Sequence, residues 1–194
     1  GNDWLIGNNL NNILRGNSGN DVIYGGIGSD TIYGGLGNDT IDLTETAAFS
    51  DTVVFEDDII QNGIDSIYSF QLGQFGDKLS FFNFSSDDYL IDIISLEKNN
   101  LTNISGKILR FVGEEFISLD NLKLLLNNEN SKLASVDFKN DTSSIFINSK
   151  SHIKGEDQKV FYVENQNNYV EVTHIATIIG SDLQLSDWTS HNIL

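Results

Sequence analysis

Apolar residues recur along the first quarter of the chain with a fixed spacing. Large apolar side chains occupy every ninth position, at Leu5, Leu14, Ile23, Ile32 and Ile41. A period of nine fits neither a helix nor a hairpin, because their side-chain periods are about 3.6 and 2. The pattern instead predicts strands of about three residues that alternate with tight turns of about six.

The turns between these strands are built from glycine and acidic residues. The consensus is G-G-x-G-x-D-x-U-x, where U is the large apolar position, as in GGIGSDTIY at 25–33 and GGLGNDTID at 34–42. Glycine permits a positive φ and exposes its carbonyl in a tight turn, and the Asp adds a carboxylate. Each turn is therefore rich in oxygen ligands. The acidic position is held by Asp3, Asp21, Asp30 and Asp39, and by Asn12 in the second unit.

Two units make one coil of 18 residues, so each turn stacks on the turn 18 residues later. Asp3, Asp21 and Asp39 then share one edge of the coil, and Asn12 and Asp30 share the other. A cation between stacked turns meets only oxygen, and a cage of about six to eight oxygens prefers Ca²⁺ to softer metals. We expect the Asp21–Asp39 site to be the strongest. The site of Asn12 and Asp30 should be weaker or empty, because it has lost one charge.

The same stacking predicts the faces of the coil. The U residues point inward and form a thin core, while the residues beside them point outward. On one outer face Tyr33 should lie over Arg15, a cation–π pair worth about 0.5–1 kcal/mol. On the other face, a ladder should form from Trp4, Val22 and Thr40.

The repeats resemble the glycine-rich nonapeptides of the hemolysin-type calcium-binding family, also called repeats-in-toxin (RTX) proteins. The units at 25–33 and 34–42 fit nearly every position, and the unit at 16–24 fits well. The resemblance implies a parallel β-roll with Ca²⁺ between its turns. Asn12 and Leu10 depart from the pattern, so Asn12 is a candidate ligand of an incomplete half-site. The other ligands that the resemblance implies are the carboxylates of Asp3, Asp21, Asp30 and Asp39, and turn carbonyls around Gly16, Ser18 and Gly19, around Gly25, Ile27 and Gly28, and around Gly34, Leu36 and Gly37.

The repeat continues in a looser form beyond the fifth unit. The x-D-x-U-x core recurs at intervals of 12, 14 and 12, which predicts longer loops, with the acid at Asp51, Asp65 and Asp77. We interpret residues 46–82 as degenerate repeats that cap the β-roll of residues 1–45, because an uncovered sheet end invites edge pairing. Asp51 is a candidate to complete the site begun by Asp30, and Asp65 the site begun by Asp39. The alternative for each is a solvated loop acid.

Charge separates this first part of the chain from the rest. The 194 residues include 28 acids and 11 bases, a formal net charge of −17, and residues 1–77 hold 12 acids against one base. This balance suits a multivalent cation and argues against partners such as nucleic acid or an anionic membrane surface. No run of 18 apolar residues occurs, so the sequence predicts no membrane span.

Residues 83–194 have the pattern of a β-rich region with one helix. A helix is predicted near 118–133. No flexible linker precedes the region, so we expect it to pack against the roll. Strand character occurs at 89–95, 107–112, 144–148, 159–163 and 169–178.

The end of the chain resembles the terminal segments of the same family. Leu183, Asp187 and Trp188 fit a loose L-x-x-x-D-aromatic motif. The resemblance implies a secretion signal that addresses the protein to the type I secretion machinery as a partner during export. The absence of cysteine agrees with a chain that crosses to an oxidising space without disulfides. The alternative is an ordinary final strand.

Motifs of catalysis are absent from the sequence. His152, His174 and His191 lie outside any H-E-x-x-H, and neither G-x-S-x-G nor a phosphate-binding G-x-x-x-x-G-K-[ST] occurs. Adjacent acids such as Asp57 and Asp58 would diverge on a strand. We therefore predict that the chain is not an enzyme.

The sequence predicts a mainly all-β protein, and its function hypothesis is a calcium-binding C-terminal module of a larger exported bacterial protein. Because the chain begins in mid-repeat at Gly1 without Met, we expect it to be part of something longer. The module should fold on several Ca²⁺ ions outside the cell or at its surface. Two alternatives stay open: an anchoring or lattice-assembly module of an S-layer protein or adhesin, in contact with neighbouring copies, and an accessory module of a secreted hydrolase that binds a cell-surface glycan.

Overall fold

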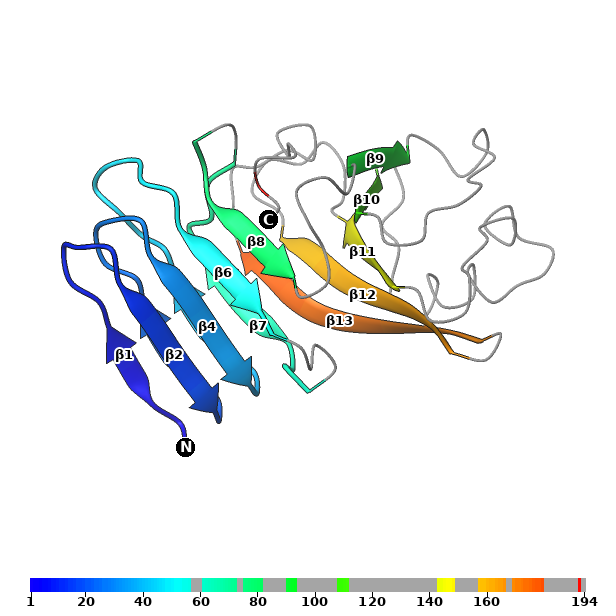
Figure 1. Cartoon of the computed structure of the whole chain (residues 1–194), viewed down its shortest axis with the longest axis horizontal. Coiled ribbons are helices and arrows are strands. Elements are labelled where there is room, and N and C mark those ends of the chain that lie inside the picture. Colours follow the sequence, from blue (N-terminus) through cyan, green and yellow to red (C-terminus); the bar gives the residue numbers. More distant parts are fainter. Residues whose placement is uncertain are drawn as a thin grey trace.

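The computed structural model covers the whole chain (Figure 1). It describes residues 1–56, 61–72, 75–81, 90–93, 108–111, 143–148, 157–166, 169–179 and 192. The predicted helix near 118–133 and the terminal motif of Leu183, Asp187 and Trp188 lie outside these residues. Within them the regular structure is β-strand, and none forms a helix with the length and apolarity that a membrane crossing requires.

The first 81 residues wind into two parallel sheets, with odd-numbered strands in one and even-numbered strands in the other (Figure 1). This is the parallel β-roll that the nonapeptide spacing predicts. The first sheet begins with β1 (Trp4–Ile6), β3 (Val22–Tyr24), β5 (Thr40–Asp42) and β7 (Asp65–Tyr68). The second consists of β2 (Ile13–Ser18), β4 (Thr31–Leu36), β6 (Thr52–Phe55) and β8 (Lys78–Phe81).

The register confirms the 18-residue coil. Trp4 pairs with Val22, and Val22 pairs with Thr40, so the predicted ladder forms. On the second sheet Arg15 pairs with Tyr33. The predicted strand length of three residues holds for β1, β3 and β5, whereas β2 and β4 are six residues long because their pairing extends into the following turn.

The core of the roll is a column of the U residues. Their side chains lie between the sheets, because alternate residues of a strand face opposite sides. Leu5 and Leu14 at the first coil are partly buried against this column. The remaining members are almost fully buried, with at most 1% of the side chain exposed: Ile23, Ile32, Ile41, Val53, Ile67 and Leu79.

The first sheet does not end with the roll. Strand β13 (Tyr169–Ile179) pairs in parallel with β7, and β12 (Gln158–Gln166) pairs antiparallel with β13. Beyond them lie β11 (Ser143–Asn148), β10 (Ile108–Phe111) and β9 (Leu90–Ile93), which complete a nine-stranded sheet. These strands confirm the strand character predicted for the second half of the chain.

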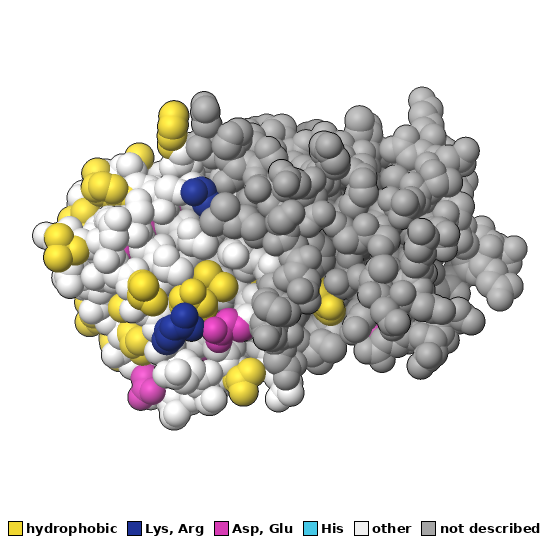
Figure 2. All heavy atoms as spheres, viewed as in Figure 1, with side chains coloured by type: hydrophobic (Ala, Val, Ile, Leu, Met, Phe, Trp, Pro, Cys, Tyr) yellow, Lys and Arg dark blue, Asp and Glu magenta, His cyan; other side chains and the backbone are white. Residues whose placement is uncertain are grey.

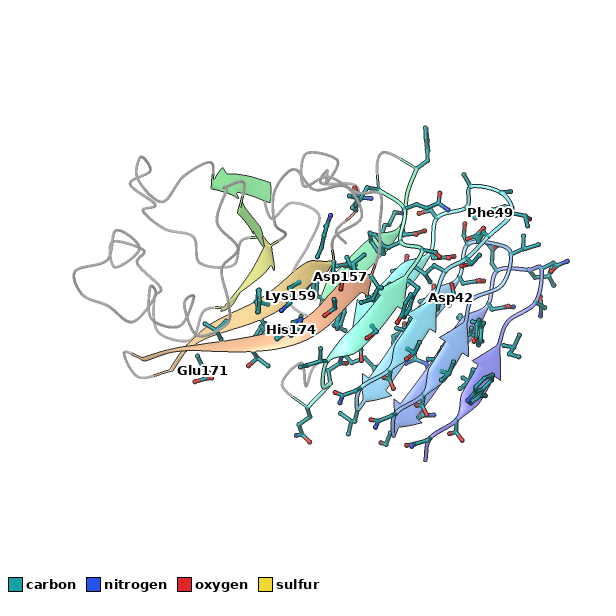
Figure 3. All side chains as sticks on the ribbon, turned by 180° about the vertical axis from the view of Figure 1, so that it is seen from behind. Asp42, Phe49, Asp157, Lys159, Glu171 and His174 are labelled. Carbon is teal, nitrogen blue, oxygen red and sulfur yellow. The ribbon has the colours of Figure 1, made fainter. Side chains whose placement is uncertain are left out.

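The β12–β13 hairpin shares the core of the roll. Val160, Ile175 and Ile178 are buried in one hydrophobic cluster with the column of U residues. On the hairpin, the ring of His174 lies 5.2 Å from that of Phe161 (Figure 3). The expectation that the two parts of the chain pack together is therefore confirmed for the described residues.

Candidate metal centres

The acidic positions of the repeats form two vertical ladders, one along each edge of the roll. In each ladder the main-chain N–H of one acidic position donates to Oδ1 of the acid in the next coil. This pattern follows from the stacking of equivalent turns. The first ladder has N–H to Oδ1 distances of 2.6, 2.8 and 3.0 Å and runs through Asp3, Asp21, Asp39 and Asp65. The second has distances of 2.8, 2.8 and 2.9 Å and runs through Asn12, Asp30, Asp51 and Asp77.

The structure therefore brings Asp51 into line with Asp30 and Asp65 into line with Asp39. Both carboxyls are buried, which argues against solvated loop acids. The ligand roles of the predicted residues stay predictions, but their placement on two shared edges is as the spacing required. Asp77 ends the second ladder. The spacing places it in an acidic position, but it is not among the predicted ligands.

The second carboxylate oxygen divides the ladder members into two groups. At the far end, Asp65 Oδ2 accepts a hydrogen bond from Asn62 Nδ2 at 2.8 Å, and Asp77 Oδ2 accepts one from the Gln71 N–H at 2.7 Å. The inner members have a buried Oδ2 with no hydrogen-bond partner: Asp21, Asp30, Asp39 and Asp51. Buried carboxylate oxygens without partners are costly, so these four positions call for a cation or a proton.

The pKa values point the same way. Without a cation, burial raises the pKa of Asp65 to about 8 and the pKa values of Asp51 and Asp77 to about 7, against an ordinary value of 3.8. Neighbouring carboxylates in the same ladder add to the rise, since like charges disfavour ionisation. Burial also raises the pKa values of Asp30 and Asp39. The metal-free ladders thus retain protons near neutral pH.

Glycine allows the turns to stack closely enough for such sites. Gly19 and Gly37 have the same positive φ of 128°, which L-residues rarely adopt. A side chain on Gly37 would collide with the carbonyl oxygen of Gly19 one coil earlier. A side chain on Gly34 would likewise collide with Oδ2 of Asp39 in its own turn. The space beside the unpartnered oxygens therefore exists only because glycine occupies these positions.

Donor chemistry fits Ca²⁺ rather than a softer metal. The turns offer main-chain carbonyls and carboxylates, which are hard oxygen ligands. No cluster of three or more His, Asp or Glu side chains with metal-site geometry occurs in the described part of the chain. The acids instead come one per turn, so main-chain carbonyls would have to supply many of the ligands. Of the predicted carbonyls, that of Leu36 already accepts the Gly19 N–H at 2.8 Å.

The half-site at Asn12 differs from the others. Its side-chain oxygen accepts the N–H of Asn8 at 2.7 Å within its own turn. A neutral amide that is already engaged is a poorer ligand than an open carboxylate. This agrees with the expectation that the Asn12–Asp30 site is weak.

Few acidic side chains appear on the face of the roll in Figure 2, where white and yellow atoms dominate. The ladder acids from Asp21 onward are at most 1% exposed. Much of the negative charge of this region is therefore held inside the turns rather than displayed to solvent. That distribution suits a buried cation better than a surface that attracts a cationic partner.

These features define a class: a calcium-binding parallel β-roll. The family model of the RTX calcium-binding nonapeptide repeat, with four copies, matches residues 6–41, so this part of the chain consists of RTX calcium-binding repeats. No curated protein matches the chain. The chain is thus a Ca²⁺-binding module, and repeats of this family are generally found in secreted proteins.

Proposed function

We propose that the chain is a calcium-dependent folding module of a larger exported bacterial protein. The observation that carries the proposal is the row of buried carboxylate oxygens without partners, at Asp21, Asp30, Asp39 and Asp51. In the unfolded chain these oxygens are hydrated. In the roll they lose water and gain no donor, so the roll is costly to form unless a cation is present.

Three kinds of residue in the roll have different roles in this folding. The glycines hold turns open so that carbonyls and carboxylates converge, and the Oδ1 atoms fix one coil to the next through main-chain N–H groups. The column of U residues supplies apolar burial in both sheets. When bound, Ca²⁺ supplies the positive charge that neutralises the inner acids. Extracellular modules commonly bind Ca²⁺ with Kd values of about 10⁻⁴–10⁻³ M.

This coupling suits export. Inside a cell free Ca²⁺ is low, so a polyanionic, glycine-rich segment stays unfolded and able to pass a secretion channel. Outside, Ca²⁺ drives formation of the roll. We propose the type I secretion machinery as the partner during export, on the strength of the terminal motif at Leu183, Asp187 and Trp188.

The test is a Ca²⁺ titration of the metal-stripped chain followed by far-UV circular dichroism, with Mg²⁺ as the control. We expect a cooperative gain of β signal between submillimolar and millimolar Ca²⁺ and no such gain with Mg²⁺. A chain that is fully folded in chelator and unchanged by Ca²⁺ would contradict the proposal.

Assembly with neighbouring copies is a second candidate function, favoured by one feature of the surface. Large apolar side chains gather on β1, on β2 and on the turn between them. Each is at least 70% exposed: Trp4, Ile6, Leu10 and Ile13. Light scattering at micromolar protein should rise with Ca²⁺ if copies pair here. A particle size that does not depend on Ca²⁺ or concentration would exclude this role.

A further inference from the structure

The loop between β5 and β6 interrupts the regular series of turns. The turn at 25–30 contains three glycines, whereas residues 43–51 contain none. No residue of this loop has a positive φ. The loop is also three residues longer, since the repeat acids Asp39 and Asp51 are 12 rather than nine positions apart. It therefore cannot present main-chain carbonyls in the way that a glycine turn does.

Glu45 of this loop reaches the second acidic ladder. Its carboxyl lies close enough to the Asp51 carboxyl and to the main-chain N–H of Gly28 for both to influence its ionisation. The charges of Asp30 and Asp77 also act on it. Glu45 Oε2 and Asp51 Oδ2 are both buried without a hydrogen-bond partner. Phe49, labelled in Figure 3, marks the same loop at the edge of the roll.

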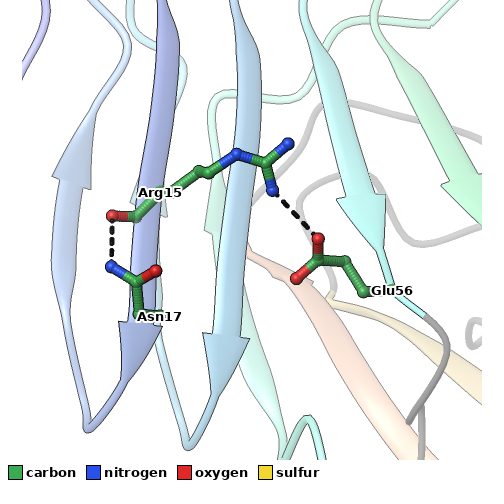
Figure 4. A network of polar contacts seen from close by, with 3 residues as sticks. All are labelled: Arg15, Asn17 and Glu56. Carbon is green, nitrogen blue, oxygen red and sulfur yellow. Dashed lines mark hydrogen bonds and ion pairs between the residues drawn. The ribbon is translucent and has the colours of Figure 1, made fainter.

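Other acids near this loop are satisfied locally. Asp42 accepts hydrogen bonds from the N–H and the hydroxyl of Thr44, at 2.9 and 2.6 Å. Glu56 pairs with Arg15 at 2.9 Å on the outer face (Figure 4). Glu45 differs from both, because it faces a second carboxylate that is itself completely buried. Two adjacent carboxylates with no donor between them repel each other unless they share a cation or a proton, and near neutral pH a cation can be held without protonating either group.

We propose that Glu45 is a calcium ligand outside the repeat positions, which supplies oxygen where the glycine-free loop does not present carbonyls as a glycine turn does. The ion would be held by Glu45 and Asp51 against the turn at 25–30. This inference rests on the proposed calcium-dependent function. It also changes one sequence-based expectation: with Glu45 added, the Asp30–Asp51 position carries more negative charge than the Asp21–Asp39 position, and should bind Ca²⁺ at least as tightly.

The test is isothermal titration calorimetry of the metal-stripped full chain with Ca²⁺ alone. The variant is Glu45→Gln, and the matched control is Glu56→Gln, which removes the same charge from the surface. We expect Glu45→Gln to lose one ion from the stoichiometry or to weaken one binding step by about tenfold, because charge count sets Ca²⁺ affinity. Glu56→Gln should match the wild type.

A second set of variants separates a ligand from a residue that only supports folding. Glu45→Gln should have little further effect in an Asp51→Asn background, but its full effect in an Asp21→Asn background. Glu45→Asp, which keeps the charge on a shorter side chain, should restore part of the affinity. Equal effects in both backgrounds, or a Glu45→Gln titration identical to wild type, would overturn the assignment. A wild type that binds no Ca²⁺ would instead refute the proposed function itself.

Discussion

The first and the last coils of the roll differ in what their buried carboxylate oxygens contact. Coils near the N-terminus have 18 residues and glycine turns, and Asp21, Asp30 and Asp39 keep a buried oxygen without a partner. Later coils are longer, since Thr52 pairs with Lys78 26 positions away. There Asn62 and the Gln71 N–H satisfy the second oxygens of Asp65 and Asp77. If the proposed function holds, the regular coils and Asp51 depend on an ion, whereas Asp65 and Asp77 at the irregular end have protein donors, so this end should form first as a template.

The largest expected effect comes from pH. Asp51, Asp65 and Asp77 have folded-state pKa values of about 7 to 8, above the ordinary 3.8. A raised acid pKa favours the fold while the group is protonated, so stability is full below about pH 4 and falls as pH rises to about 8. The β signal of the metal-free chain in far-UV circular dichroism should therefore be larger at pH 5.5 than at pH 8. The opposite order would contradict the burial of these carboxyls.

Shortening a core side chain should cost more stability at the far end of the roll than at the first coil. Ile67→Ala in Ca²⁺ should cost about 2–5 kcal/mol, because the side chain is fully buried. Leu5→Ala should cost less, since Leu5 is only partly buried at the first coil. Denaturant unfolding of both variants in saturating Ca²⁺ is the measurement. Equal losses would mean that the first coil is as well packed as the last.

A glycine substitution tests the close stacking of turns. Gly37→Ala places a side chain on a residue with φ of 128° and against the Gly19 carbonyl. The strain should cost about 1–3 kcal/mol and raise the Ca²⁺ concentration needed for folding. Circular dichroism during a Ca²⁺ titration measures that shift. Gly1→Ala, where an added Cβ meets nothing within 4 Å, serves as the control.

Asp→Asn substitutions compare an acid whose second oxygen has no partner with an acid whose second oxygen accepts a hydrogen bond. Asp39→Asn should weaken Ca²⁺-dependent folding by about tenfold, since it removes an anionic oxygen that has no protein partner. Asp65→Asn should have a smaller effect on the Ca²⁺ midpoint, because Asn62 already occupies its second oxygen. A larger effect at Asp65 would reverse the assignment of the two regions.

The smallest effect is expected on the outer face. The guanidinium carbon of Arg15 lies 3.4 Å from the ring centroid of Tyr33, which is the predicted cation–π contact. Arg15 also forms an ion pair with Glu56 (Figure 4). Both charged side chains are about half exposed. Glu56→Gln should therefore change the unfolding free energy by less than about 1 kcal/mol. A greater loss in a thermal melt would show a network beyond this pair.

Sequence reasoning succeeded wherever the period held. The spacing of nine fixes the stack of turns, so the two ladders and the inward column could be read from the positions of acids and U residues alone. It could not identify Glu45, because the residue lies in an aperiodic loop and no spacing relates it to Asp51. It also missed the role of Asn62, which no repeat position specifies. The pairing of β13 with β7 carries no periodic signal at all.

That last pairing has a kinetic and practical consequence. Asp65 lies beside Ala176, so the first sheet is continued from β7 to β13 by a contact between residues far apart in the chain. Such a contact pays loop-closure entropy before it gains any stability, which slows folding. If a protease cuts the intervening chain, β13 belongs to a separate fragment that is held to β7 only by noncovalent contacts. The stability of the first sheet would then depend on the protein concentration, and unfolding curves recorded at several concentrations would reveal the cut.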